Sequence, residues 1–408
     1  MIKFIKHYSK NKVSLIFIII GSIACIQVLS SIILGRMLTK EDFGMYSFVF
    51  RTIVPLITML ALLGQDIAIV RYFSKNDFTH YNWKVYFKRI SSAFLIIISL
   101  AIFLISLFYK LHYSYYIFMF LAIFSNTILN LIGSLLRSKQ NFTASIFLTR
   151  GTIILFVCFV VLLFLFNFKS IQSFSVLRTL SYIATCIIVC LFFFRRYPNG
   201  SKPISRSIYS DGILLWGIGL TLLVIGRIDA FFIVKYLDFK AVAGYSILSA
   251  FIQIYDFATQ AIYNVYSQKF SSHYKPDLKR FLSKIILIAL LISVFYFIFG
   301  KPILHFIFKG KYDEFIFLLL PFCMIGCLRL IYMYPSCYFI GKSDTHTLKS
   351  FLKYNLIGVF FNILFIHLGL KYFGLMGAAL SGVFVWIYRN IVGYYLVFGD
   401  AKKRSMAL

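Results

Sequence analysis

The chain has 408 residues, of which 61% are hydrophobic and only 13% are charged, and this composition excludes an ordinary water-soluble globular protein. Its net charge of +29 comes from 42 Lys and Arg residues against 13 Asp and Glu residues. In a chain this apolar, basic residues typically flank membrane spans on the cytoplasmic side. The composition therefore predicts a membrane protein with several spans and no nucleic-acid partner.

A helical span needs about 20 consecutive, mostly apolar residues, and about twelve runs in this chain meet that requirement. They cover residues 13–34, 44–64, 90–109, 114–136, 146–167, 174–194, 212–234, 241–263, 284–305, 314–340, 351–370 and 374–398. The first run is longer than a typical signal peptide and lacks a small-residue cleavage site, so we expect a retained helix. Pro55, Pro321 and Pro335 fall inside spans, where proline can kink a helix. The predicted fold class is all-α, a polytopic membrane protein of about 12 transmembrane helices.

The basic residues are distributed unevenly between the two sides of these spans. The two termini and every second loop hold about 26 Lys and Arg residues, whereas the other loops hold about 10. Because positive residues accumulate in the cytoplasm, this asymmetry places both termini there. An even number of spans leads to the same orientation.

A short motif occurs twice, about half a chain apart. Gly44 to Ser47 reads Gly-Met-Tyr-Ser, and Gly244 to Ser246 reads Gly-Tyr-Ser, each beside a junction between two spans. We therefore predict two lobes of six helices with the same orientation, residues 1–200 and 201–408, as in transporters with parallel repeats. Chance similarity in so biased a composition is the alternative.

Apart from Lys284, Lys301, Glu314 and Lys353 near the ends of their runs, eight charged residues fall inside the predicted spans, where a charge costs about 2.5–3.5 kcal/mol on insertion scales. The basic ones are all arginines: Arg51, Arg150, Arg178, Arg227, Arg329 and Arg389. The acidic ones are Asp229 and Asp256. Such residues usually face a water-filled cavity or a partner, and guanidinium binds phosphate and carboxylate groups well. The excess of arginines therefore predicts a cationic cavity that binds an anionic ligand.

Simpler interpretations stay open for some of these residues. Arg150 and Arg178 lie about four residues from a span end and can reach the membrane interface instead. Asp229 is either one member of a structural salt bridge or a carboxylate that titrates during transport. The same alternatives apply to Asp256.

The sequence contains no pattern typical of an enzyme or a metalloprotein. All seven cysteines lie in apolar runs, which indicates neither a disulfide framework nor a metal site. Gly341-Lys342-Ser343 lacks the earlier glycine of a phosphate-binding loop, because Ser336 occupies that position. We therefore predict a protein without enzymatic activity, catalytic residues, metal or cofactor.

Several motifs resemble those of one known family. Residues 32–47, which include Arg36 and Gly44, resemble the signature that joins the first two helices of bacterial polysaccharide flippases. Residues 226–246 resemble their seventh and eighth helices, and Gly374 to Ala379 resembles the start of their last helix. These flippases of O-antigen and other lipid-linked oligosaccharides belong to the multidrug/oligosaccharidyl-lipid/polysaccharide (MOP) exporter superfamily.

The resemblance implies a specific substrate and location. The substrate would be an undecaprenyl-pyrophosphate-linked glycan that crosses from the inner to the outer leaflet of the bacterial cytoplasmic membrane. Transport would proceed by alternating access, with a central cationic cavity between the two lobes. The partners would be this lipid-linked glycan and the lipid bilayer, and the polysaccharide polymerase machinery is a further candidate.

Three other functions are alternatives to this one. An ion-coupled drug antiporter of the same superfamily would be expected to have an acidic cavity for cationic drugs, the opposite of the arginines here. A lipid II flippase typically has additional helices, for which this chain is short. A membrane glycan polymerase or ligase usually has a long external loop with catalytic residues, and the sequence shows none.

Overall fold

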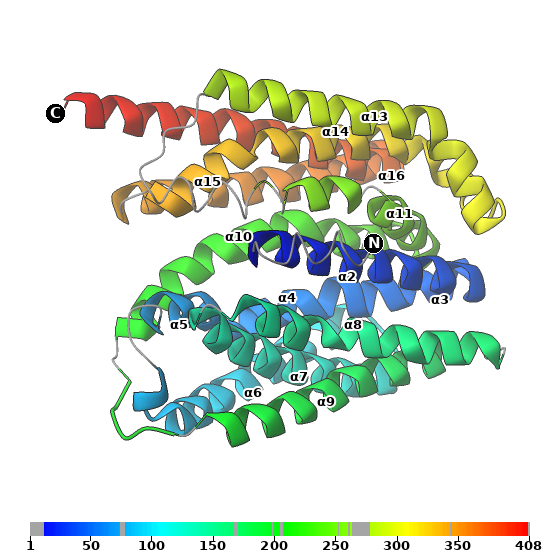
Figure 1. Cartoon of the computed structure of the whole chain (residues 1–408). Helices are drawn as coiled ribbons and strands as arrows, with labels where there is room; N and C mark the ends of the chain where they lie inside the picture. Colours follow the sequence, from blue (N-terminus) through cyan, green and yellow to red (C-terminus); the bar gives the residue numbers. More distant parts are fainter. Residues whose placement is uncertain are drawn as a thin grey trace, which may run out of the picture. The chain divides into compact units, whose positions relative to one another are not determined.

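The structure is a computed structural model that describes residues 12–406, except 74–77, 140, 167, 169, 198, 205–206, 252, 260–261, 263–277 and 343–344. Within these residues every regular element is a helix (Figure 1). An isolated bridge between Tyr81 and Lys202 is the one β-type pairing in this part of the chain.

The chain folds into two compact units, residues 1–223 (unit 1) and 224–408 (unit 2). The boundary between them falls inside a helix, α10. The elements up to and including this helix are α2 (Lys12–Met37), α3 (Lys40–Ser47), η1 (Phe48–Ile53), α4 (Val54–Leu62), α5 (Gln65–Phe73), η2 (Phe78–His80), α6 (Trp83–Phe108), α7 (Tyr113–Ser138), α8 (Phe142–Leu165), α9 (Ile171–Arg196) and α10 (Ser207–Tyr236). Those that follow are α11 (Phe239–Phe251), α13 (Leu278–Phe308), η3 (Asp313–Leu318), α14 (Leu319–Ile331), α15 (Met333–Lys342) and α16 (Thr345–Met406).

Helix α7 is the core of unit 1, because it packs against α4, α5, α6, α8 and α9. Buried hydroxyls of Thr127, Ser134 and Ser138 donate to carbonyls of the same helix, the first of them to Ile123 at 2.7 Å. Small residues let α8 approach closely, and the Ser145 hydroxyl on α8 donates to the Gly133 carbonyl of α7 at 2.7 Å. Small residues at helix contacts are typical of membrane proteins.

All three predicted proline sites lie in the first turn of a helix, where the missing N–H is tolerated. Pro55 follows the start of α4, Pro321 lies near the start of α14, and Pro335 near the start of α15. Before Pro55 the backbone forms a π-helix, η1, in which the Val54 N–H bonds to the Val49 carbonyl. Since Pro55 has no N–H for the carbonyl of Arg51, a wider turn at this arginine accommodates the missing bond.

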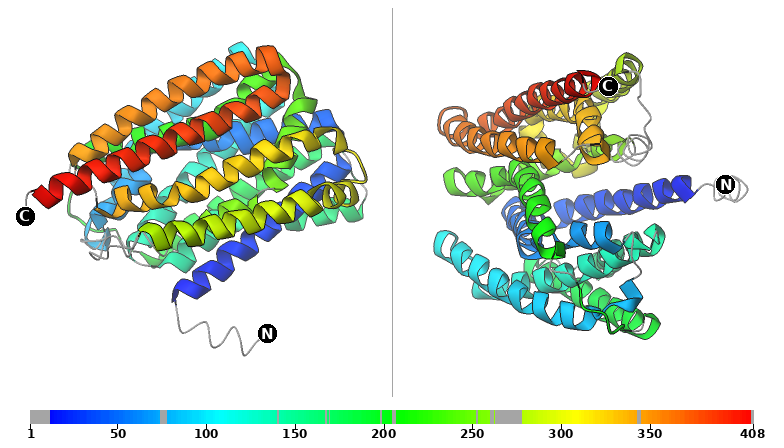
Figure 2. Two further views of the ribbon diagram at one scale, coloured as in Figure 1. Left: turned by 90° about the horizontal axis from the view of Figure 1, so that it is seen from above. Right: turned by 90° about the vertical axis from the view of Figure 1, so that its left-hand side faces the viewer.

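In unit 2, α16 is two helices joined at Gly374, whose φ of 56° and ψ of −141° break the helical path. The halves, orange and red in Figure 2, run antiparallel. Ring contacts join them from Phe361 to Tyr388 (5.8 Å) and from Phe365 to Phe384 (5.9 Å). The break explains why the sequence shows two apolar runs, 351–370 and 374–398, within one helical segment.

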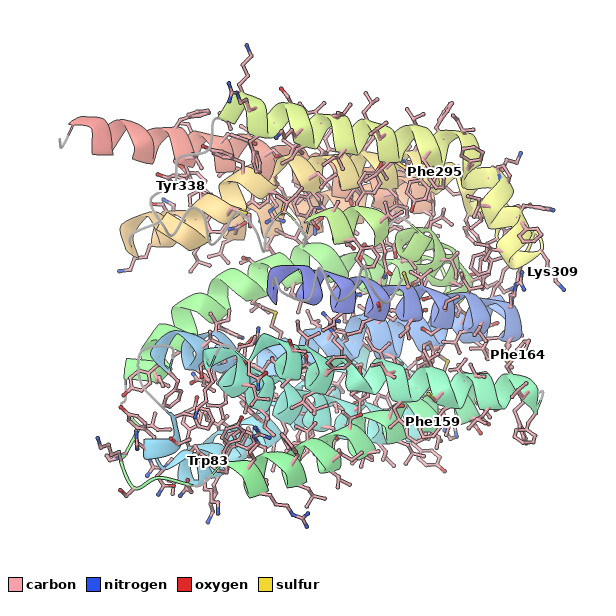
Figure 3. All side chains as sticks on the ribbon, in the orientation of Figure 1. Trp83, Phe159, Phe164, Phe295, Lys309 and Tyr338 are labelled. Atoms are coloured by element: carbon pink, nitrogen blue, oxygen red, sulfur yellow. The ribbon has the colours of Figure 1, made fainter. Side chains whose placement is uncertain are left out.

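Eight helices among the described residues are long and apolar enough to cross a membrane, or nine if one bent pair is a single span. Many of their large apolar side chains are exposed, as expected for contact with lipid. Phe164 at the end of α8 and Phe295 on α13 are examples (Figure 3). The predicted all-α membrane fold is thus confirmed, whereas the count of twelve helices and the division into six-helix lobes stay predictions.

Candidate functional site

Arg51 lies inside the π-helix η1 of unit 1 and is half-buried. Its Nη2 donates a hydrogen bond to the Ser31 hydroxyl of α2 at 2.6 Å. The guanidinium carbon lies 5.3 Å from the centroid of the Phe43 ring. The wide turn before Pro55 therefore directs this arginine towards groups on α2 and α3.

Arg178 on α9 is held by neutral groups of the same unit. Its Nη1 donates to the Thr152 carbonyl at 3.1 Å, and its Nη2 donates to the Tyr182 hydroxyl at 3.0 Å. The guanidinium also lies over the rings of Phe156 (4.9 Å) and Tyr182 (4.6 Å). Arg150 on α8 is exposed at the surface of the structure and interacts electrostatically with Tyr182.

Tyr46 lies within electrostatic reach of two of these arginines, Arg51 and Arg178. It is buried, and its ring stacks on Phe156 at 6.1 Å. Among the described residues, no carboxylate forms an ion pair with Arg178 or Arg150. The N-terminal arginine set, Arg51, Arg150 and Arg178, is therefore a cationic and aromatic environment.

Arg329 and Asp256 form an ion pair in unit 2, with 2.9 Å between Nη1 and Oδ1. Arg329 lies near the end of α14, and Asp256 lies on a helical segment at residues 253–259. The pair is accessible, since 29% of the Arg329 side chain and 44% of the Asp256 side chain are exposed. The guanidinium of Arg329 also lies 5.3 Å from the ring of Trp386.

The second predicted carboxylate belongs to the same group of charges. Asp229 on α10 forms a hydrogen bond with the Tyr245 hydroxyl on α11 and accepts the N–H of Ala230 at 2.8 Å. Arg227 and Arg329 both interact electrostatically with Asp229. Two arginines and two aspartates of unit 2 therefore act on one another.

Arg389 is the most deeply buried of the predicted arginines, with 5% of its surface exposed. Its guanidinium carbon lies 4.1 Å from the ring of Trp386 and 4.4 Å from the ring of Tyr332. Trp386 therefore lies under both Arg329 and Arg389. The structure thus brings the eight predicted residues into two sets, three in unit 1 and five in unit 2.

The aromatic members of both sets were not predicted from the sequence. Helical spacing could have identified two of them, because Tyr182 follows Arg178 by four residues and Trp386 precedes Arg389 by three. Tyr245 and Tyr332 come from other helices, so no local pattern indicates their contacts.

A further acidic residue lies outside the candidate spans. Asp66 on α5 is half-buried, and this burial raises the pKa of its carboxyl above the ordinary value, while the nearby Arg137 guanidinium acts in the opposite direction. Arg137, near the end of α7, also donates to the Ser134 hydroxyl at 2.7 Å. Both residues lie just outside the predicted apolar runs 44–64 and 114–136, so hydropathy did not indicate this pair.

Comparison with known structures shows the fold. The chain is 15% identical to the lipid II flippase MurJ, with a TM-score of 0.68, covering 95% of this chain and 87% of that one. It is 16% identical to an inward-facing multidrug resistance MATE family transporter of the MOP superfamily, with a TM-score of 0.66, covering 96% and 99%. A MOP superfamily transporter from Pyrococcus furiosus is 14% identical, with a TM-score of 0.60, covering 97% and 95%.

Comparison of the sequences shows the family. No curated protein matches the chain significantly. The profile of the family described as polysaccharide biosynthesis protein matches residues 9–270, well over half of the chain. This match confirms the resemblance that the motifs around Gly44 and Arg227 indicated. The chain therefore belongs to the polysaccharide biosynthesis protein family and has the fold of the MOP superfamily transporters.

Proposed function

We propose that this protein moves an oligosaccharide linked to undecaprenyl pyrophosphate from the inner to the outer leaflet of the bacterial cytoplasmic membrane. Transport proceeds by alternating access and leaves the substrate chemically unchanged. The glycan is a repeat unit of O-antigen or of another surface polysaccharide. Membership of the polysaccharide biosynthesis protein family supports this class of substrate.

The observation that carries the proposal is the excess of arginines among helices that can cross a membrane. The predicted spans contain six arginines and two aspartates. A guanidinium stays protonated in any such setting and can hold a phosphate group through two parallel hydrogen bonds. In the proposal the arginines hold the pyrophosphate or acidic sugars while the lipid tail stays in the bilayer.

The surroundings of the arginines fit this role. Arg178 is held by neutral partners, so an incoming anion does not have to displace a carboxylate from this guanidinium. Arg329 is bound to Asp256 but remains partly exposed, so an anionic group can compete for its free N–H donors. A cationic drug would be repelled by the same arginines. The aspartates then serve as internal counter-charges or as coupling groups.

The orientation is part of the proposal. In this orientation both termini lie in the cytoplasm, because most loop Lys and Arg residues are then on the cytoplasmic side. The substrate then enters from the leaflet on which its glycan is assembled. The polysaccharide polymerase machinery is the proposed partner on the opposite side.

Deletion of the gene in its own host tests the proposal. We expect undecaprenyl-linked repeat units to accumulate on the inner leaflet and surface polysaccharide to be lost, because the repeat unit no longer crosses. Extraction and analysis of lipid-linked sugars, together with staining of surface glycan, measure both effects. Re-expression of the full chain should reverse them. Normal surface glycan in the deletion strain contradicts the proposal.

A further inference from the structure

The guanidinium of Arg389 is enclosed by aromatic rings within unit 2. Its 5% exposure makes it the one arginine among the buried polar residues of the described chain. Trp386 and Tyr332 supply rings at 4.1 and 4.4 Å. Ring faces stabilise a cation, but they bring no negative charge that would neutralise it.

The charge of Arg389 has no acidic partner in the part of the chain that the structure describes. Its Nε is buried and makes no hydrogen bond, and its hydrogen bond with a side chain is to the neutral hydroxyl of Tyr332. Arg329 adds a second positive charge nearby. An isolated charge away from water is costly unless an opposite charge or a polar group compensates it. A bound anion would therefore stabilise the guanidinium of Arg389.

A cavity lies next to this guanidinium. Its volume is about 10 Å³, which leaves room for a single guest of about the size of one water molecule. It is lined by Tyr332, Phe351, Tyr354, Asn355, Tyr388, Arg389, Val392 and Gly393. Arg389 is the one charged residue of this lining, and most of the other members are aromatic or apolar.

We propose that this cavity is a binding site for a small monovalent anion of the halide type, held against Arg389. One negative charge neutralises the one enclosed cation, and the Nε–H of Arg389 supplies a free donor. The positive edges of the surrounding rings also tolerate a negative guest. This assignment takes Arg389 out of the set of arginines that hold the transported glycan in the proposed function, since a glycan diphosphate is too large for the cavity.

Trp386 is a built-in reporter, because its ring lies 4.1 Å from the guanidinium of Arg389. The chain has three tryptophans, so the variant W83F/W216F leaves Trp386 alone. Bromide quenches tryptophan fluorescence at short range, and Trp386, which does not itself line the cavity, lies against the guanidinium that does. Bromide is added to the full-length protein in detergent at constant ionic strength, with gluconate as the balancing anion. We expect the quenching of Trp386 fluorescence to saturate as the bromide concentration rises. Chloride should compete with bromide for this saturable part.

Two further variants in the W83F/W216F background distinguish bromide binding beside Arg389 from a general effect of removing a positive charge. In Arg389→Gln we expect the apparent bromide affinity to fall at least tenfold, leaving only linear, collisional quenching. Lys353→Gln removes an exposed cation from the same helix, α16, and should leave the saturable quenching unchanged. Linear quenching in the parent protein, or saturable quenching that persists in Arg389→Gln, contradicts the site.

A measurement on the unaltered chain covers the case in which Arg389→Gln does not fold. A ligand that binds the folded state raises the unfolding temperature. We expect the unaltered protein to unfold at a higher temperature in chloride than in gluconate at equal ionic strength. Equal unfolding temperatures in the two salts contradict the proposal. Neither experiment uses the transported substrate, so a negative result leaves the proposed function untouched.

Discussion

The variant Arg329→Gln is expected to lower export of the repeat unit roughly 10- to 100-fold while the protein still inserts in the membrane. The physical reason is the loss of charge-assisted hydrogen bonds to the anionic substrate, which are worth about 1.5–3 kcal/mol. Each 1.4 kcal/mol corresponds to about a tenfold change. Surface polysaccharide in the complemented deletion strain measures the effect, with membrane levels of the protein as the reference.

The partner Asp256 separates a binding role of Arg329 from a structural one. If Arg329 binds substrate, Asp256→Asn frees its guanidinium and preserves export, and the double variant stays as defective as Arg329→Gln. If the ion pair only holds helices together, each single variant is defective in export, whereas the double variant, which lacks both charges, exports again. Lys284→Gln, which removes an exposed cation from the same unit, should export normally. Recovery of export in the double variant contradicts the binding role.

The second large effect is expected at the contact between the two halves of α16. A Cβ added at Gly377 would lie 2.0 Å from the carbonyl oxygen of Gly369, far inside van der Waals contact. Because the obstacle is backbone, no side-chain rotation relieves it. Gly377→Ala should therefore lower the free energy of unfolding by about 1–3 kcal/mol.

The matched control for this substitution is Gly399→Ala, in the same helix. A Cβ added at Gly399 meets no other atom within 4 Å, so alanine there should be neutral or slightly stabilising. Thermal unfolding of the purified full-length proteins in one detergent compares them. An unfolding temperature of Gly377→Ala equal to that of the parent would show that the halves of α16 do not pack as described.

Most helices were predictable because an apolar run is a local property of the chain. The run at 114–136 became α7, Tyr113–Ser138, almost without change. The run at 90–109 gave a longer helix, α6, which begins at Trp83 because the Asn82 side chain accepts the Val85 N–H at 3.2 Å. Capping extends a helix beyond the apolar segment, and hydropathy does not detect it.

The charged residues of the site were predictable, but their partners were not. A charge in an apolar run is visible in one sequence, whereas the pairing of Arg329 with Asp256 joins residues 73 positions apart. It depends on the rotation of each helix about its axis and on how the helices pack. The π-helix around Arg51 was missed for a similar reason, since Pro55 predicted a kink and the backbone instead formed a wider turn.

Purified protein in sealed vesicles can show whether this chain transports a lipid-linked glycan. Vesicles loaded with an undecaprenyl-pyrophosphate-linked oligosaccharide are followed by the accessibility of its sugar to an impermeant glycan-oxidising reagent. We predict that the sugar crosses the bilayer faster in vesicles that contain the parent protein than in protein-free vesicles, and that Arg329→Gln slows this movement. Movement no faster than in protein-free vesicles, together with uptake of a cationic drug by the same protein, would show that this chain is a drug antiporter and not a glycan flippase.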